Sequence, residues 1–233
     1  MRLLLLSNST SPGRAYLDHA SSWLAAFLDG AERVAFVPYA GVTVGWDAYA
    51  DKVRGALPGG LELVSAHETE RATDALDGAD AVLVGGGNTF HLLREMYRTG
   101  LVDALRDRVR DGLPFVGWSA GSNVACPTIR TTNDMPIVQP PSFDALGLVP
   151  FQINPHYTDA HPDGHQGETR AQRLAEFVAA NPDVPVIGLP EGTALRVDGL
   201  QLDLLGGGAL RFDPESPEGR PATAEAVRAL AAL

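Results

Sequence analysis

The sequence predicts an α/β fold whose mostly parallel sheet is covered by helices on both faces. Short apolar segments alternate with longer amphipathic ones along most of the chain, which is the pattern of a doubly wound parallel sheet. Several short segments are apolar at every position, as expected for strands buried on both faces. The predicted strands are residues 3–6, 34–37, 61–64, 81–84, 114–117 and 186–189.

The segments between these strands place apolar residues at helical spacing. Near the end, residues 194–197 and 200–204 flank the turn Asp198-Gly199 and predict a β-hairpin. Residues 222–233 predict a closing helix. The other predicted helices are residues 16–28, 90–97, 101–110 and 168–180.

Length and cysteine content limit the class of protein. At about 150 residues per domain, the 233 residues, which no linker or repeat divides, predict one α/β domain over residues 1–233. The single cysteine, Cys126, permits no internal disulfide. We therefore expect a hydrophobic core and a cytoplasmic location, with Cys126 as a small buried residue.

Charge and the amino-terminal segment exclude several partners. The formal net charge is -11, from 29 acidic and 18 basic residues. Such a surface repels nucleic acid and anionic lipid, so we expect neither as a partner. The apolar run at residues 3–6 is shorter than the core of a signal peptide or a membrane span, and neither is predicted. An acidic substrate would need a cation supplied by its own site.

The first site candidate is the segment Gly117-Trp118-Ser119-Ala120-Gly121. This G-x-S-x-G pattern follows a predicted strand and opens a short predicted helix, which is the setting of a nucleophile elbow. The small neighbours allow other backbone to approach the serine closely. The alternative is a glycine-rich turn in which Ser119 only caps a helix.

The second candidate is the glycine loop, residues 85–89 (GGGNT), which lies between a predicted strand and a predicted helix. Backbone N–H groups at such a junction can supply part of an oxyanion hole or hold a phosphate. The loop matches neither the P-loop nor the dinucleotide-binding spacing, so the oxyanion hole is preferred. A plain tight turn is the remaining alternative.

A serine nucleophile needs a general base. His156 follows a short apolar segment within residues 127–165, a long stretch of the kind that usually carries function, and is the preferred base. A rival interpretation is a metal site formed by His156 with four other residues of this stretch. Their spacing matches no familiar zinc pattern, and no metal is expected. The four residues are Asp159, His161, Asp163 and His165.

For the acid that orients this base, Glu191 is the first choice because it stands at the end of the last apolar strand. Asp134 is the second choice, and either one can instead be a solvated loop carboxylate. The chain order is serine, histidine, acid. An α/β-hydrolase has the order serine, acid, histidine, which argues against an esterase or lipase.

Seven segments together resemble peptidase E, the α-aspartyl dipeptidase family of serine peptidases, whose wider clan includes cyanophycinase. They occur in the same order over residues 5–192, which is more specific than any single motif. The segments are residues 5–10 (LLSNST), 85–90 (GGGNTF), 117–123 (GWSAGSN), 131–136 (TTNDMP), 154–157 (NPHY), 164–170 (GHQGETR) and 187–192 (IGLPEG).

The resemblance implies a flavodoxin-like or class I glutamine-amidotransferase-like α/β fold, no cofactor, and cleavage of Asp-Xaa dipeptides. It implies Ser119 as nucleophile, His156 as base and Glu191 as third member. The resemblance also makes a homodimer possible, because members of the family can form them. Alternatives are a cyanophycinase-like or other amide hydrolase of the clan, or an anion- or nucleotide-binding protein that uses the glycine loop.

The resemblance also assigns residues outside the catalytic triad. It implies that the N–H groups of Gly87 and Ala120 form the oxyanion hole and that Arg170 binds the aspartate side chain. Arg170 is otherwise readable as a surface residue of its helix. Asn88 is a further candidate for substrate binding, and Asp134 is one for recognition of the free α-amino group.

Overall fold

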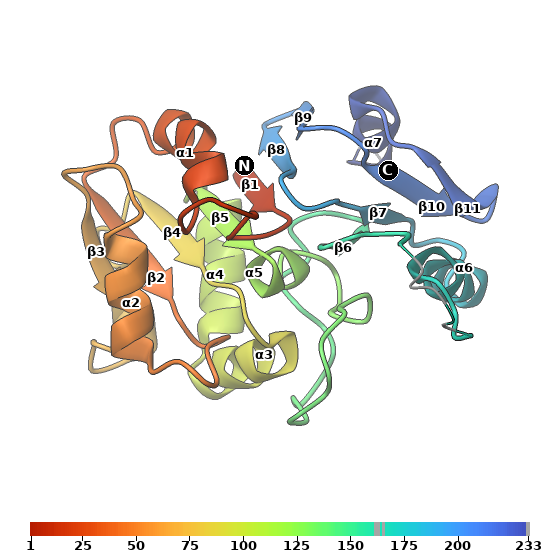
Figure 1. Cartoon of the computed structure of the whole chain (residues 1–233). Coiled ribbons are helices and arrows are strands. Elements are labelled where there is room, and N and C mark those ends of the chain that lie inside the picture. The colour runs from red at the N-terminus through yellow and green to blue at the C-terminus, as the bar shows by residue number, and fades with distance from the viewer. Residues whose placement is uncertain (161–163, 165, 232–233) are drawn as a thin grey trace.

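The computed structural model describes residues 1–160, 164 and 166–231, and its main feature is a seven-stranded sheet (Figure 1). The first five strands of the sheet order are parallel, β8 is antiparallel to β1, and β9 is antiparallel to β8. The strand order is β3 (Glu62–Ser65), β2 (Arg33–Val37), β4 (Ala81–Val84), β5 (Phe115–Trp118), β1 (Arg2–Leu6), β8 (Ala194–Asp198) and β9 (Gln201–Leu205).

Helices cover both faces of this sheet, and the predicted three-layer fold class is confirmed. Leu4 and Leu6 pack on the face covered by α1 (Ser21–Phe27) and α2 (Trp46–Arg54). Leu3 and Leu5 belong to the opposite core, with α3 (Thr89–Arg98), α4 (Leu101–Arg110) and the short α5 (Ala120–Asn123). A strand with apolar side chains on both faces is stable only when both are covered.

A second sheet lies beside the first (Figure 1). Its order is β11 (Ser216–Pro221), β10 (Leu210–Asp213), β7 (Val186–Gly188) and β6 (Gln152–Asn154). Helix α6 (Arg170–Ala180) packs against β10 and β11, and α7 (Ala224–Ala231) packs against β9. The carboxyl ends of β6 and β7 therefore bring residues of this second sheet toward those of β5.

The structure differs from the sequence prediction in both halves of the chain. The strand expected at residues 186–189 belongs to the second sheet, because β8 occupies the free side of β1. Helix α2, the 3-10 helix η2 (Ala72–Leu76), and strands β10 and β11 were not predicted. Of the closing helix expected at 222–233, the last two residues lie outside the described part.

The first predicted helix, residues 16–28, is also shorter than expected. Leu17 has a positive φ of 59°, and the 3-10 helix η1 (Asp18–Ala20) precedes α1. A branched side chain at positive φ cannot continue a right-handed helix. Across the described residues, every helix is too short or too polar to span a lipid bilayer.

Candidate active site

Ser119 stands at the sharp turn between β5 and α5. Its backbone has φ 53° and ψ -113°, a conformation that non-glycine residues rarely adopt. The turn is tight because its glycines approach other backbone: a Cβ on Gly121 would collide with the carbonyl of Val84, and one on Gly117 would collide with that of Gly121. A strained serine between such glycines has the geometry of a nucleophile elbow.

His156 links this serine to Glu191. Its Nε2 lies 2.9 Å from Ser119 Oγ, and its Nδ1 lies 2.8 Å from Glu191 Oε1. A carboxylate only accepts hydrogen bonds, so Nδ1 carries the proton and donates it. Nε2 is then the acceptor for the Ser119 hydroxyl, which is the tautomer that a general base requires.

Two residues that follow β1 hold His156 and Glu191 in place. Ser7 Oγ accepts from the backbone N–H of His156 at 2.8 Å and donates to the carbonyl of Leu189 at 2.8 Å. Asn8 Oδ1 accepts from the N–H of Gly192, next to Glu191, at 2.8 Å. Both residues are buried, so the turns after β6 and β7 are fixed against the end of the large sheet.

Asp134 has different partners. Its Oδ2 accepts from the backbone N–H of Thr89 at 2.7 Å, from Thr89 Oγ1 at 2.5 Å and from Thr132 Oγ1 at 3.1 Å. The structure thus brings Glu191, and not Asp134, to His156. A carboxylate at the first N–H of α3 also opposes phosphate binding there, because it already satisfies the donor and the helix dipole.

The glycine loop lies against the serine. A Cβ on Gly86 would be 3.0 Å from Ser119 Cβ, and Gly87 has φ 140° with no room for a side chain against Ala40. The N–H groups of Gly87 and Ala120 donate to no acceptor within the described ranges. Two such free donors near a nucleophile are what a developing oxyanion needs.

Tyr49 of α2 fixes this loop to the serine strand. Its Oη donates to the carbonyl of Gly86 at 2.9 Å and accepts from Trp118 Nε1 at 3.1 Å. Burial raises the pKa of Tyr49, so its phenol remains a donor. Because C=O and N–H point in opposite directions in a trans peptide, holding the Gly86 carbonyl also orients the N–H of Gly87.

Arg170 begins α6 beside a cavity of about 530 Å³ that Asp134 and Asn154 also line. Its Nη1 is buried and has no hydrogen-bond partner within the described part of the chain. Burial lowers the pKa of Arg170, and the neighbouring Arg173 lowers it further. Tyr157 Oη is also buried and finds no partner in the same described part of the chain. Unpaired buried donors are costly, and an anionic ligand would satisfy them.

Asn88 has a structural task. Its Oδ1 accepts from the N–H of His91 at 3.0 Å, which caps α3, and its Nδ2 donates to the carbonyl of Met135 at 2.9 Å. Both ends of the amide are therefore occupied.

The metal alternative lacks support at His156, since both of its ring nitrogens have other partners. His161, Asp163 and His165 lie outside the described residues.

Cys126 is buried behind the elbow. Its Sγ accepts from the N–H of Ile153 at 3.2 Å, and burial raises its pKa to about 12. The thiol is therefore neutral near neutral pH and lacks the thiolate character of a nucleophile.

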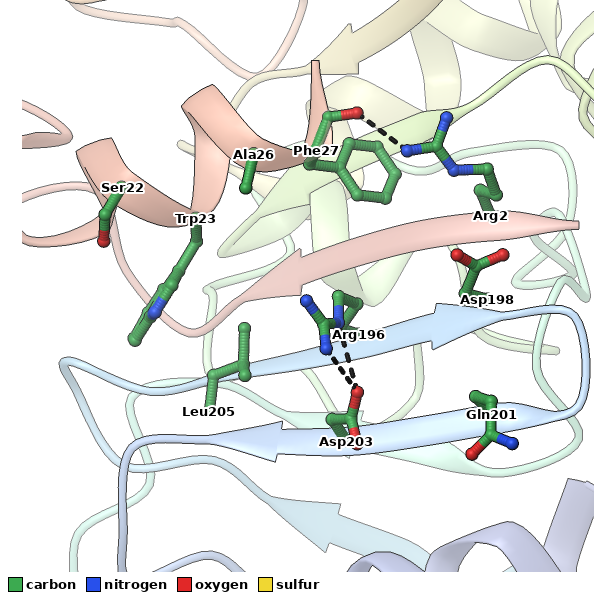
Figure 2. A pocket seen from close by; sticks show the side chains of 10 residues that line it. All are labelled: Arg2, Ser22, Trp23, Ala26, Phe27, Arg196, Asp198, Gln201, Asp203 and Leu205. Carbon is green, nitrogen blue, oxygen red and sulfur yellow. Dashed lines mark hydrogen bonds and ion pairs between the residues drawn. The ribbon is translucent and has the colours of Figure 1, made fainter. Parts of the chain in front are cut away.

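Arginines also line a groove of about 350 Å³ between α1 and the strands β8 and β9 (Figure 2). Arg196 Nη2 lies 2.6 Å from Asp203 Oδ2, and Arg2 Nη2 donates to the carbonyl of Phe27 at 3.0 Å. This groove runs along β8 and β9 from Arg2 to Leu205, and it shares no lining residue with the cavity of Arg170.

The sequence profile of Peptidase family S51 matches residues 3–205. The chain belongs to this family. It is 52% identical over 208 residues to peptidase E of Salmonella arizonae, covering 89% of this chain and 90% of that protein. It is 48% identical over 225 residues to peptidase E of a Nostoc species, covering 94% of this chain and 93% of that one.

Solved structures share the fold of this S51 peptidase. A Listeria monocytogenes protein superimposes with a TM-score of 0.63 at 25% identity, over 87% of this chain and 96% of that one. A peptidase from an acI-B1 actinobacterium gives a TM-score of 0.64 over 95% and 93% of the two chains. At 16% identity the second likeness shows the fold alone.

Sequence reasoning gave no individual role to Ser7, Asn8, Tyr49 or Tyr157. The signal for the first two was present: they are polar residues directly after a buried strand, where parallel sheets gather their functional groups. Tyr49 lies on a helix that was not predicted. Tyr157 packs in a cluster with Leu174 and Val178 of α6, and no sequence pattern reveals this packing.

Proposed function

We propose that this S51 peptidase is a serine dipeptidase that hydrolyses Asp-Xaa dipeptides through an aspartyl-enzyme intermediate. The observation that carries the proposal is the hydrogen-bonded series Ser119, His156 and Glu191, at 2.9 and 2.8 Å. The relatives named peptidase E are consistent with such a substrate. The protein is proposed to act in the cytoplasm without a cofactor.

In the proposed mechanism, His156 Nε2 takes the hydroxyl proton of Ser119 while Oγ attacks the aspartyl carbonyl carbon. The N–H groups of Gly87 and Ala120 stabilise the oxyanion. When the C–N bond breaks, the amine leaves with the proton held on Nε2. Water then attacks the ester, again with His156 as base, and releases aspartate and free Ser119. Glu191 keeps Nδ1 protonated and stabilises the imidazolium.

Selection of aspartate is assigned to Arg170, assisted by Tyr157. Both present buried donors that have no partner among the described residues, and the guanidinium can bind a carboxylate with two parallel hydrogen bonds. In a chain of net charge -11, this local cation offsets the repulsion of an acidic substrate. Asp134, which lines the same cavity, is proposed as the acceptor for the free α-amino group.

The test is hydrolysis of Asp-Leu, Glu-Leu, Asn-Leu, Ala-Leu and β-Asp-Leu by the wild type and by Ser119→Ala. Asp-Leu is expected to be cleaved much faster than the other four peptides, and Ser119→Ala should lose about four or more powers of ten in kcat. Circular dichroism of Ser119→Ala checks that the fold is retained. A fluorophosphonate probe should label Ser119 in the wild type.

Other outcomes would contradict the proposal in different ways. Cleavage of β-Asp-Leu in preference to Asp-Leu would point to a cyanophycinase-like enzyme. Equal rates for wild type and Ser119→Ala would remove Ser119 as nucleophile. Sedimentation analysis would test the homodimer, which stays a prediction.

A further inference from the structure

A second cavity borders the glycine loop. It has a volume of about 630 Å³ and shares no lining residue with the cavity of Arg170. Gly86 and Gly87 form part of its wall, so it opens beside the proposed oxyanion hole. Its other lining residues include Tyr16, Val42, Val44, Lys52, Asn88 and Ile137.

The walls of this cavity combine apolar surface with one cation. Val42, Val44 and Ile137 are each about half exposed, at 50%, 48% and 51%. Exposed apolar side chains gathered at a cavity often mark a binding site. Lys52, the only lysine of the chain, holds its Nζ 4.2 Å from the centre of the Tyr16 ring. It forms no ion pair with any carboxylate of the described ranges.

We infer that this cavity receives the residue that follows aspartate, with its apolar side chain on Val42, Val44 and Ile137 and its free carboxylate near Lys52. This inference rests on the proposed function. The Arg170 cavity supplies the cation for the aspartyl side chain. The scissile carbonyl must lie between Ser119 and Gly87. The leaving residue then requires a separate space, and this cavity begins at Gly87.

The tyrosines connect the two ends of this cavity. Tyr49 Oη donates to the carbonyl of Gly86, and Tyr16 Oη donates to Tyr49 Oη at 3.1 Å. Lys52 stacks on the same Tyr16 ring. This series of contacts connects Lys52 to the Gly86 carbonyl and so to the glycine loop. Each added residue would move the terminal carboxylate of a substrate by up to about 3.5 Å. A positive charge at one position in the cavity therefore favours peptides of one length.

The deciding measurement compares Asp-Leu with Asp-Leu-amide, which lacks the terminal carboxylate. Lys52→Gln should lower kcat/KM for Asp-Leu about fivefold, the size of an exposed charge contact. It should change kcat/KM for Asp-Leu-amide less than twofold, and Lys52→Arg should restore the Asp-Leu rate. The matched control is Arg110→Gln, which removes the same charge at the far end of α4.

A second variant tests the apolar wall. Val44→Asp should reduce the ratio of kcat/KM for Asp-Leu to that for Asp-Lys about tenfold, because an apolar leaving residue would have to desolvate the new carboxylate, whereas a cationic one is attracted to it. Leu200→Asp is the control: it adds the same charge at a side chain that is 90% exposed in the β8–β9 turn. It should leave the ratio unchanged.

Two results would overturn the inference while leaving the proposed function intact. One is an equal effect of Lys52→Gln on Asp-Leu and on its amide. The other is an unchanged leaving-residue preference in Val44→Asp. If the wild type cleaves neither Asp-Leu nor Asp-Leu-amide, the proposed function itself fails, and the inference fails with it.

Discussion

The cavity of Arg170 and the groove between α1 and β9 both contain arginine side chains, but the arginines of the two sites differ in whether they have hydrogen-bond partners. In the groove, Arg196 is paired with Asp203 and Arg2 with a backbone carbonyl (Figure 2). In the cavity, Nη1 of Arg170 is buried and has no partner across the described residues. Two concave, arginine-lined surfaces of one protein therefore differ in what they offer to a ligand.

This difference teaches that shape and residue type are weaker guides to a site than unsatisfied bonding capacity. A surface arginine that is already paired with a carboxylate contributes little to stability and attracts an anionic ligand only weakly. Its charge is offset by the carboxylate and screened by water. A buried arginine nitrogen without a partner carries a penalty that a ligand can relieve. Variants of Ser119, of its hydrogen-bond partners and of Arg170 should therefore affect catalysis, and variants of the groove residues should not.

The largest expected effect separates the two candidate acids. Glu191→Gln should lower kcat about a thousandfold, since a neutral amide neither fixes the His156 tautomer nor stabilises its charged form. Asp134→Asn should act mainly on KM and on stability, because Asp134 bonds to Thr89 and Thr132. Steady-state kinetics and thermal unfolding distinguish them. A larger kcat loss in Asp134→Asn would make Asp134 the third catalytic residue.

Arg170→Ala tests the contrast between the two arginine sites directly. It should lower kcat/KM for Asp-Leu about a hundredfold, the scale of a buried charge-assisted contact, and leave the slow cleavage of Ala-Leu nearly unchanged. Arg196→Ala should change both rates less than twofold. Tyr157→Phe should act in the direction of Arg170→Ala, about fivefold. Unchanged relative rates for Asp-Leu and Ala-Leu in Arg170→Ala would refute the assignment.

A smaller effect is expected from the tyrosine that orients the glycine loop. Tyr49→Phe removes the donor to the Gly86 carbonyl and should lower kcat about tenfold with KM little changed. Tyr16→Phe keeps the bonds of Tyr49 to Trp118 and Gly86, and its kcat loss should be clearly smaller. If the two variants lose kcat equally, Tyr49 does not position the oxyanion hole.

Cys126 should take no part in catalysis, and its thiol should not react with reagents in the folded protein. Burial raises its pKa to about 12 from 9.0, so the thiol is neutral at pH 8. Iodoacetamide at pH 8 should label it only after unfolding in urea. A raised thiol pKa contributes stability below pH 9 that is lost as the pH rises toward 12. Labelling of the native protein at pH 8 would contradict this burial.

The sequence predicted most strands of the large sheet closely, but it predicted only some of the residues that the structure places around Ser119. Strands β1, β2, β4 and β5 consist of apolar residues on both faces, which only a doubly covered sheet can bury. Helix α2 was missed. It follows a stretch rich in glycine and valine, and its nine residues, WDAYADKVR, intersperse four charged side chains among the apolar ones. Without α2, the link from Tyr49 to the glycine loop had no basis.

The sequence by itself determined the fold class, the elbow at Ser119 and the glycine loop, because these depend on local backbone requirements and hydrophobic periodicity. Only the tertiary structure decided which carboxylate meets His156. Glu191 and Asp134 are both loop acids in sequence, and 35 residues separate His156 from the one that it contacts. The tertiary structure also decided that Nη1 of Arg170 has no partner among the described residues while Arg196 pairs with Asp203. Pairing depends on which side chains converge in space, and a sequence records no distances between distant residues.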